Sequence, residues 1–320
     1  MPAIITRGAM SAQGFGYGAA ASGIPGDGTK GIFALGYCTA TRNKYIYSNC
    51  SSTATGVGSA SQPSTNGAAA GNSTAGIFAV GSISTIRNKY TYACCSSTSV
   101  GVASSSVSSC GGSAAGNSTR GIFAIGRTLV GCCFQALTTR NKYTYSSCTS
   151  TACGVASSSA VSSGGSAAGN STSGIFALGN SCTIRNKYTY SSCASTASGV
   201  ASSSAVSNRG SAAGNNTRGI FALGYACFIP TTIRNKYTYA CCTSTAIGVA
   251  ASSTLSSGGS AAGNSTRGIF ALGGSACFIP TTIRNKYLYS SCTSTATGVG
   301  AASVASAGGS AASWAVCVNV

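Results

Sequence analysis

Side chains that support acid–base or metal chemistry are nearly absent from this chain of 320 residues. It contains no His and one acidic residue, Asp27. General acid–base catalysis needs a positioned proton donor and acceptor, and metal-assisted catalysis needs a cluster of ligands. We therefore expect no enzyme activity, no cofactor and no metal site.

Cysteine is the one reactive residue type present in quantity, with 17 copies. Six of them recur at one position of a repeated segment: Cys50, Cys95, Cys148, Cys193, Cys242 and Cys292. If the copies of this segment stack side by side, equivalent positions in neighbouring copies lie farther apart than the roughly 7 Å between Cα atoms that a disulfide tolerates. Without His and without Cys-x-x-Cys pairs, zinc binding is not expected either.

The charge is strongly positive, with 19 Lys and Arg and a formal net charge of +18. Such a charge ordinarily suggests nucleic acid or an anionic surface as partner. Most of these cations belong to six copies of Arg-Asn-Lys-Tyr spread along the chain, so we do not expect nucleic-acid binding. Residues such as Arg185 and Lys187 could bind anionic glycan. We favour the interpretation that they are ordinary strand residues whose side chains face solvent.

The elements that position these residues are six copies of one segment. Its Gly-Ile-Phe-Ala core begins at Gly31, Gly76, Gly121, Gly174, Gly219 and Gly268, at spacings of 45 to 53 residues. The fourth copy predicts four strands, over residues 166–169, 174–179, 186–191 and 199–203. Gly-Asn-Ser-Thr between the first two predicts a turn; its Asn170 begins a glycosylation sequon, but we favour the turn-forming role.

A four-stranded meander cannot bury both of its faces alone, whereas radial stacking of copies can. The repeat length therefore predicts an all-β propeller of four-stranded blades rather than a β-solenoid. We expect one domain over residues 1–320, with six full repeats beginning near residues 20, 68, 113, 166, 211 and 260. The ends, residues 1–19 and 309–320, are expected to form a composite seventh blade that closes the ring. A six-bladed ring with loose tails is the alternative.

The repeat resembles the kelch-type propeller repeat, and more closely a glycine-rich kelch-like group in bacteriophage tail and other virion proteins. That group carries Ala-Ala-Ala-Gly-Asn-Ser-Thr, a Gly-aromatic-Phe-Gly-Gly-Gly strand and Asp-Lys-Tyr-Thr-Tyr-Ser-Ser-Asp; the match covers about residues 20 to 313. The resemblance implies a propeller from a virion. This chain departs from it by placing Cys at the second Asp position. Where kelch-like repeats often carry Arg before the first strand, it has Gly164, Gly258 and Gly308, while Arg209 remains.

The copies differ mainly in the loop that precedes Arg-Asn-Lys-Tyr. It has five residues in copies one, two and four, thirteen in copy three, nine in copy five and ten in copy six. Length variation confined to one loop marks one face of a repeat protein, often the binding face. The candidate binding residues are Leu129, Phe134, Phe228, Ile229, Pro230, Phe278, Ile279 and Pro280. These side chains could form a protein interface, or they could fold back as caps over the blades.

We expect a non-enzymatic structural or attachment protein of a phage virion: tail, baseplate, fibre or capsid decoration. It would bind other virion proteins, in multiple copies, or a host-surface glycan through the long loops. The alternative is a lectin-like cell-surface binding module or an extracellular filament subunit. Residues 1–7 show no secretory signal and no apolar run is long enough to span a membrane, so we expect a virion location without a membrane span.

Overall fold

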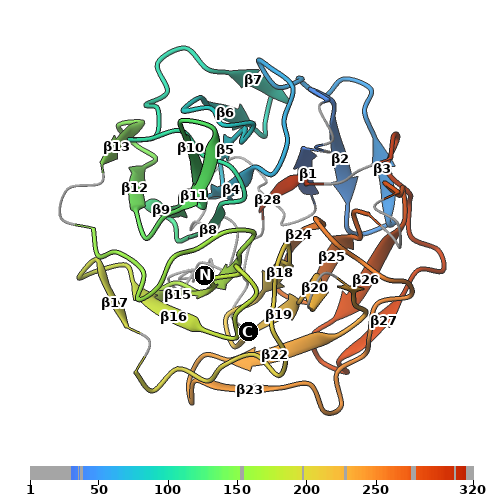
Figure 1. Cartoon of the computed structure of the whole chain (residues 1–320). Helices are drawn as coiled ribbons and strands as arrows, with labels where there is room; N and C mark the ends of the chain where they lie inside the picture. Colours follow the sequence, from blue (N-terminus) through green and yellow to red (C-terminus); the bar gives the residue numbers. More distant parts are fainter. Residues whose placement is uncertain are drawn as a thin grey trace, which may run out of the picture.

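The chain folds into six four-stranded antiparallel sheets arranged around a central axis, as in a propeller (Figure 1). The computed structural model describes residues 30–34, 36, 39–151, 155–196, 198–226, 229–274, 279–305 and 308–314. Every regular element of these residues is a β-strand. The predicted all-β propeller of four-stranded blades is therefore confirmed.

Each blade runs from an inner strand at the axis to a short outer strand at the rim. The first blade has β28 (Ser310–Trp314), β1 (Lys30–Ala34), β2 (Arg42–Ile46) and β3 (Ser51–Thr53). The second has β4 (Ala68–Gly71), β5 (Ala75–Ala79), β6 (Arg87–Thr91) and β7 (Ser96–Thr98). The third has β8 (Ser113–Gly116), β9 (Arg120–Ala124), β12 (Arg140–Thr144) and β13 (Thr149–Thr151).

The remaining blades follow the same order. The fourth has β14 (Ser166–Gly169), β15 (Ser173–Ala177), β16 (Arg185–Thr189) and β17 (Ala194–Thr196). The fifth has β18 (Ser211–Gly214), β19 (Arg218–Ala222), β22 (Arg234–Thr238) and β23 (Thr243–Thr245). The sixth has β24 (Ser260–Gly263), β25 (Arg267–Ala271), β26 (Arg284–Leu288) and β27 (Thr293–Thr295). Two hairpins stand apart: β10 (Arg127–Val130) with β11 (Cys133–Ala136), and β20 (Tyr225–Ala226) with β21 (Ile229–Pro230).

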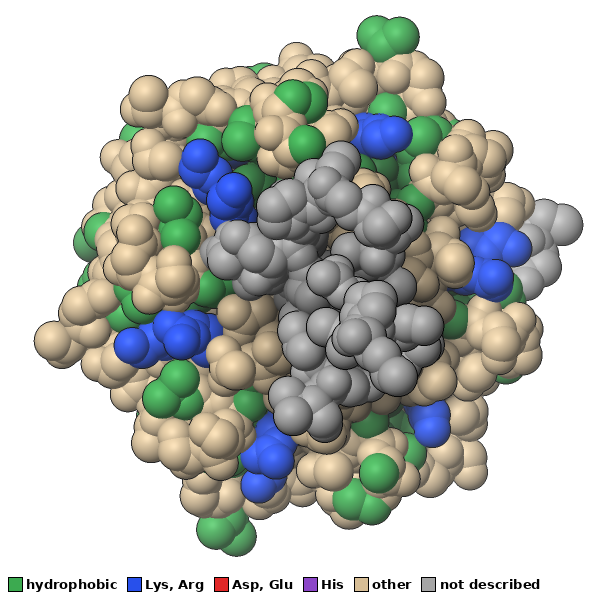
Figure 2. All heavy atoms as spheres, turned by 180° about the vertical axis from the view of Figure 1, so that it is seen from behind, with side chains coloured by type: hydrophobic (Ala, Val, Ile, Leu, Met, Phe, Trp, Pro, Cys, Tyr) green, Lys and Arg blue, Asp and Glu red, His purple; other side chains and the backbone are tan. Residues whose placement is uncertain are grey.

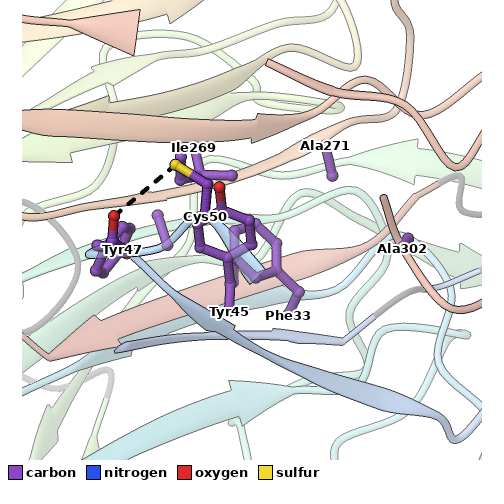
Figure 3. Close-up of a cluster of buried hydrophobic side chains, with 9 residues drawn as sticks. Phe33, Tyr45, Tyr47, Cys50, Ile269, Ala271 and Ala302 are labelled. Atoms are coloured by element: carbon purple, nitrogen blue, oxygen red, sulfur yellow. Dashed lines mark hydrogen bonds between the residues drawn. The ribbon is translucent and has the colours of Figure 1, made fainter. Parts of the chain in front are cut away.

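The apolar core consists of the spaces between neighbouring blades. Between the third and fourth blades, Ala115 and Ile122 pack against Phe176 and Tyr188. The same arrangement joins the sixth and first blades, where Ile269 and Ala271 lie beside Phe33, Tyr45 and Cys50 (Figure 3). Because each blade is covered on both faces by its neighbours, the second strand is buried throughout, as its continuous apolar run predicted.

The small residues near the axis are required by close packing. A Cβ atom on Gly174 would lie 2.9 Å from the Cβ atom of Ala115 in the preceding blade and 2.9 Å from Tyr190 Oη. The inner strands carry Ser, Ala and Gly because six of them converge on the axis. Crowding at the axis thus explains the sequence of the first strand in each copy.

The Gly-Asn-Ser-Thr segment forms the predicted turn between the first two strands. Asn170 Oδ1 accepts hydrogen bonds of 3.0 Å from the main-chain amides of Thr172 and Ser173. Its Nδ2 donates to the carbonyl of Asn216 in the next blade at 3.3 Å. The Asn of this turn therefore orders the turn and links neighbouring blades, which accounts for its recurrence.

The fourth strand lies earlier in each repeat than predicted. In the fourth blade it is β17, directly after the turn at Cys193, and not residues 199–203. Gly199 instead has φ +67°, and the following Ala201 donates its amide to the carbonyl of Cys242 in the next blade at 3.1 Å. This segment leaves its own sheet because its apolar side chains pack into the space between the fourth and fifth blades.

The ring closes with six blades, so the expected composite seventh blade is wrong and the six-bladed alternative holds. β28 from the C-terminal end pairs antiparallel with β1, with Phe33 opposite Ala311. It thereby supplies the inner strand of the first blade and protects the edge of β1. The C-terminal segment is therefore not a loose tail. Residues 1–19, expected to contribute to the seventh blade, and the predicted start near residue 20 lie outside the described residues.

Contacts of Arg284 leave no place for another blade. Its Nη2 donates to Asn43 Oδ1 of the first blade at 3.2 Å, and its guanidinium lies 4.7 Å from the centre of the Phe33 ring. These contacts repeat those between the other neighbouring blades, so the sixth and first blades are direct neighbours. In the part of the chain that the structure describes, no helix is long and apolar enough to cross a membrane.

Candidate functional site

The Arg of each Arg-Asn-Lys-Tyr segment joins two blades and does not face solvent. Arg140, at the start of β12, donates from Nη2 to Asn186 Oδ1 of the next blade at 3.3 Å and from Nη1 to Ser195 Oγ. Its guanidinium lies 4.7 Å from the centre of the Phe176 ring. The prediction of solvated strand residues is therefore wrong for the arginines, which are also too buried to reach a glycan.

These six arginines are buried without an acidic partner among the described residues. Burial lowers the pKa of Arg140 to about 10, because removal from water disfavours the charged form. Neutral amide and hydroxyl oxygens and an aromatic face are its partners. These contacts between neighbouring blades are therefore made without Asp or Glu.

The lysines of the repeated segments lie on different blades around the ring. Figure 2 shows the face behind that of Figure 1, where Lys and Arg side chains form separate groups around the ring. The Lys of the repeated segment is half-buried, as at Lys89 and Lys187.

The repeated Cys ends the turn between the third and fourth strands. Cys50, Cys95, Cys148, Cys193, Cys242 and Cys292 all have φ between +52° and +55°. The Cys50 thiol donates to the carbonyl of Tyr47 at 3.9 Å (Figure 3). Cations of the preceding blade lie near several of these sulfurs, with Lys89 Nζ 3.7 Å from Cys148 Sγ. All six are free thiols in a structural turn.

The long loops of copies three, five and six lie on one face of the ring. Strands alternate in direction within each blade, so the loops before the third strands and the connections into the inner strands lie on the same side. Leu129 and Phe134 belong to hairpin β10–β11, and Ile229 and Pro230 form β21. Ile279 and Pro280 belong to the loop of the sixth blade. Phe228 and Phe278 lie outside the described residues.

Apolar side chains at the tips of these loops are exposed. The exposed fractions are 44% for Leu129, 53% for Phe134, 68% for Ile229 and 61% for Ile279, whereas Pro230 and Pro280 are half-buried. Leu129 and Phe134 lie opposite one another in the register of β10 and β11. Of the two hypotheses for these loops, apolar exposure favours an interface over caps folded onto the blades.

A cavity of about 270 Å³ opens on the same face, at the base of the two hairpins. Its lining residues are Asn66, Gly111, Arg127, Ser163, Gly164, Asn208, Arg209 and Tyr225. Arg127 begins β10 and Tyr225 begins β20, whereas Ser163 and Gly164 precede the inner strand of the fourth blade. The cavity therefore lies over the fourth blade, whose own loop is short, between the hairpins of its neighbours.

Two guanidinium groups line this cavity, each held against an aromatic ring. The Arg127 guanidinium lies 4.4 Å from the centre of the Phe134 ring, and that of Arg209 lies 5.8 Å from the centre of the Tyr225 ring. Arg127 Nε is buried and has no hydrogen-bond partner among the described residues. The sequence-based candidates did not include these arginines. The signal was present at Arg209, the one copy with Arg where most others have Gly.

The polar groups that the described residues bring together suit an anion and not a metal ion. Within the described residues no three His, Cys, Asp or Glu side chains lie close enough together to hold a metal ion. The cavity is lined by cationic, amide, hydroxyl and phenol groups. Such a set can bind an anion by charge and hydrogen bonding.

Comparison with known proteins supports the fold. No family model matches the chain, and no curated protein matches its sequence. Among solved structures, the one titled "Structure of YjhT", a kelch-type propeller, matches with a TM-score of 0.58. The match covers 77% of this chain and 86% of that chain at 12% identity. At this identity the likeness shows a shared β-propeller fold.

Proposed function

We propose that this propeller is a non-enzymatic structural and attachment module that binds partner proteins through the long loops of one face. The observation that carries this proposal is the exposure of Leu129, Phe134, Ile229 and Ile279 at the tips of three loops. Exposed apolar side chains gathered on one face are typical of protein interfaces. The blades supply a rigid ring that holds the three loops at fixed positions.

A virion is the setting we propose for this module, located in a tail, baseplate, fibre or capsid. The support for this narrower proposal is the resemblance of the repeat to glycine-rich propellers of virion proteins. In such an assembly many copies would contact neighbouring proteins through the same loops. A host-surface glycan is the further partner that we propose for the loop face, and the cavity between the hairpins supports it.

The test is to replace the loop tips by small polar residues in the triple variant Phe134→Ser, Ile229→Ser and Ile279→Ser. We expect about tenfold less of the variant in assembled particles purified from the source, because truncating central interface residues costs well over 1 kcal/mol. The amount incorporated is measured by quantitative mass spectrometry. The variant should keep the unfolding temperature of the parent chain, since these side chains are mostly exposed.

The matched control is the double variant Val100→Ser and Ile247→Ser. These side chains are 86% and 88% exposed, and the two residues follow the outer strands β7 and β23 and not the long loops. The control should be incorporated like the parent chain. Undiminished incorporation of the triple variant, or an equal loss in the control, would contradict the proposal.

A further inference from the structure

We propose that the cavity between hairpins β10–β11 and β20–β21 is a binding site for a small oxyanionic ligand, one that carries a carboxylate or phosphate group. This inference goes beyond contact at the loop tips. It rests on the cavity at the base of the hairpins and holds whether or not the tips bind a protein. The site is built mainly from three successive blades and their loops.

Charge is the first reason for assigning an anion to this site. Arg127 and Arg209 both line the cavity, and no described residue carries a carboxylate that could neutralise them. Guanidinium groups bind carboxylate and phosphate through paired, charge-assisted hydrogen bonds. The net charge of +18 adds a long-range attraction for anions.

Preorganisation of the two guanidinium groups is the second reason. Arg127 is packed 4.4 Å from the Phe134 ring, and Arg209 lies 5.8 Å from the ring of Tyr225, which is itself buried. Neither guanidinium donates a hydrogen bond to any described residue, and Arg127 Nε is buried without a partner. Groups held in place with open donors lose little conformational freedom when a ligand binds.

The backbone around Arg209 is the third reason. At the axis the residues preceding the inner strands are Asn66, Gly111, Gly164, Arg209, Gly258 and Gly308, all with positive φ. Main-chain hydrogen bonds of 2.5 to 2.9 Å join five of the six neighbouring pairs. Of the described residues, only the pair Gly164 and Arg209 lacks this bond, and both of them line the cavity.

Arg209 has φ +54°, a left-handed conformation that Gly adopts freely and that Arg adopts at a cost. Three of the other copies avoid that cost with Gly at this position, and Gly111 makes a fourth. A strained residue that places a cation in a cavity is expected where the side chain has a role in binding.

The volume of the cavity limits the size of the ligand, and its neutral lining residues indicate which other groups the ligand carries. A volume of about 270 Å³ corresponds to roughly nine water molecules in the liquid, and so to a ligand on the order of ten heavy atoms. Asn66, Ser163 and Asn208 add amide and hydroxyl groups, which suit a ligand that also carries hydroxyls. Glucuronate and glucose 6-phosphate are suitable probes for the two anionic groups, with glucose as the neutral control.

The experiment is calorimetric titration of the full chain with these three probes at one fixed ionic strength. We expect both anions to bind and glucose not to bind. Tighter binding of glucuronate would identify a carboxylate ligand, and tighter binding of glucose 6-phosphate a phosphoryl ligand; either supports the site. The variants Arg127→Gln and Arg209→Gly should each weaken binding about tenfold or more, since each removes a charged hydrogen-bond donor.

Lys142→Gln is the matched control, because it removes a half-buried cation far along the blade from the cavity. The affinity of this variant for the anions should stay within about twofold of that of the parent chain. If the anions bound only through the net charge, Lys142→Gln and the two Arg variants would lose affinity to the same extent. Arg209→Gly introduces the residue that most other copies carry at this position. We therefore expect this variant to fold like the parent chain, so that a loss of affinity reports on the binding site.

Absence of anion binding at millimolar concentrations, equal binding of glucose, or equal effects of Lys142→Gln and Arg209→Gly would overturn the proposal. The double variant Ile229→Ser and Ile279→Ser separates the two proposals, because it leaves the Phe134 ring beside Arg127 in place. It should keep anion binding even where it loses incorporation into particles.

Discussion

A buried cation with only neutral partners is the most unusual feature at the scale of single residues. In each blade the Arg of Arg-Asn-Lys-Tyr contacts an amide, a hydroxyl and an aromatic ring of the next blade, as Arg140 does with Asn186, Ser195 and Phe176. The planar guanidinium is needed because one group must donate in two directions and also stack on a ring. An ammonium group cannot reproduce these three contacts together.

We therefore predict that Arg140→Lys lowers the free energy of unfolding by about 2 to 4 kcal/mol, the cost of disrupting a buried hydrogen-bonded cation. Denaturant unfolding followed by circular dichroism measures this change. Arg120→Lys is the control: Arg120 is half-buried and donates from Nη1 to the Tyr190 carbonyl at 2.8 Å, a contact that Lys can also make. Equal losses in the two variants would show that the stacked, forked geometry has no special role.

The role of this Arg was not readable from its sequence neighbourhood. Alternation in Arg-Asn-Lys-Tyr predicts that Tyr188 is buried and Lys187 is not, and the structure agrees. It says nothing about Arg185, whose partners Ser244 and Asn235 belong to another repeat. Periodicity reports which face of a strand is covered, whereas hydrogen-bond partners depend on how neighbouring blades are placed.

At the scale of elements, the turn between the third and fourth strands combines a residue type and a backbone conformation that fit poorly. Cys148 has φ +52°, a region in which Asp and Asn are favoured over most other residues, and Lys89 Nζ lies 3.7 Å from its sulfur. A carboxylate at this position would accept a charged hydrogen bond from Lys89.

Replacement of Cys148 by Asp should accordingly raise the free energy of unfolding by about 1 kcal/mol, the upper end for a partly exposed ion pair. Urea unfolding at low and high salt measures the gain, which should shrink as salt screens the pair. Cys133→Asp adds the same charge at an exposed site of β11 without a positive φ, so it controls for the reduced net charge. A Cys148→Asp variant no more stable than Cys133→Asp would contradict this account.

The strand boundaries of the fourth copy show how accurately the strands could be predicted from the sequence. The first strand of the fourth copy was predicted over the residues that form β14, and the second and third within two residues of their observed ends. The fourth was misplaced because Gly199 begins a segment that pairs with the next blade and not with its own sheet. Composition identifies an extended segment, but its pairing partner is set by tertiary packing.

At the scale of the whole molecule, the main feature is the way in which the ring of blades closes. β28 carries the last described residues and completes the first blade beside β1, so the two ends of the propeller are joined in one sheet (Figure 1). Arg284 makes the same contacts to the first blade that the other five arginines make to their neighbours. The strand β28 therefore completes the first blade and covers the edge of β1.

A chain that ends at Gly309 should unfold at a temperature at least about 10 °C lower, because β1 loses its pairing partner and several kcal/mol of ladder and packing energy. It should also associate through the open edge, as measured by size-exclusion chromatography with light scattering. A synthetic peptide of residues 308–320 should restore both properties when added. Unfolding of the shortened chain at the parent temperature would show that β28 does not hold the ring closed.

The amino-acid sequence by itself determined the repeated blade: its four-strand order, the burial of Ile and Phe in the second strand and the small residues at the axis. Each of these follows from patterns within about 45 residues of chain, where apolar spacing and turn residues act locally. Tertiary structure alone decided the number of blades, since closure pairs Ser310–Trp314 with Lys30–Ala34 from the other end of the chain. It also brought Arg127 and Arg209 to one cavity. The ring places the long loops of the third and fifth blades on either side of the fourth blade, whose own loop is short.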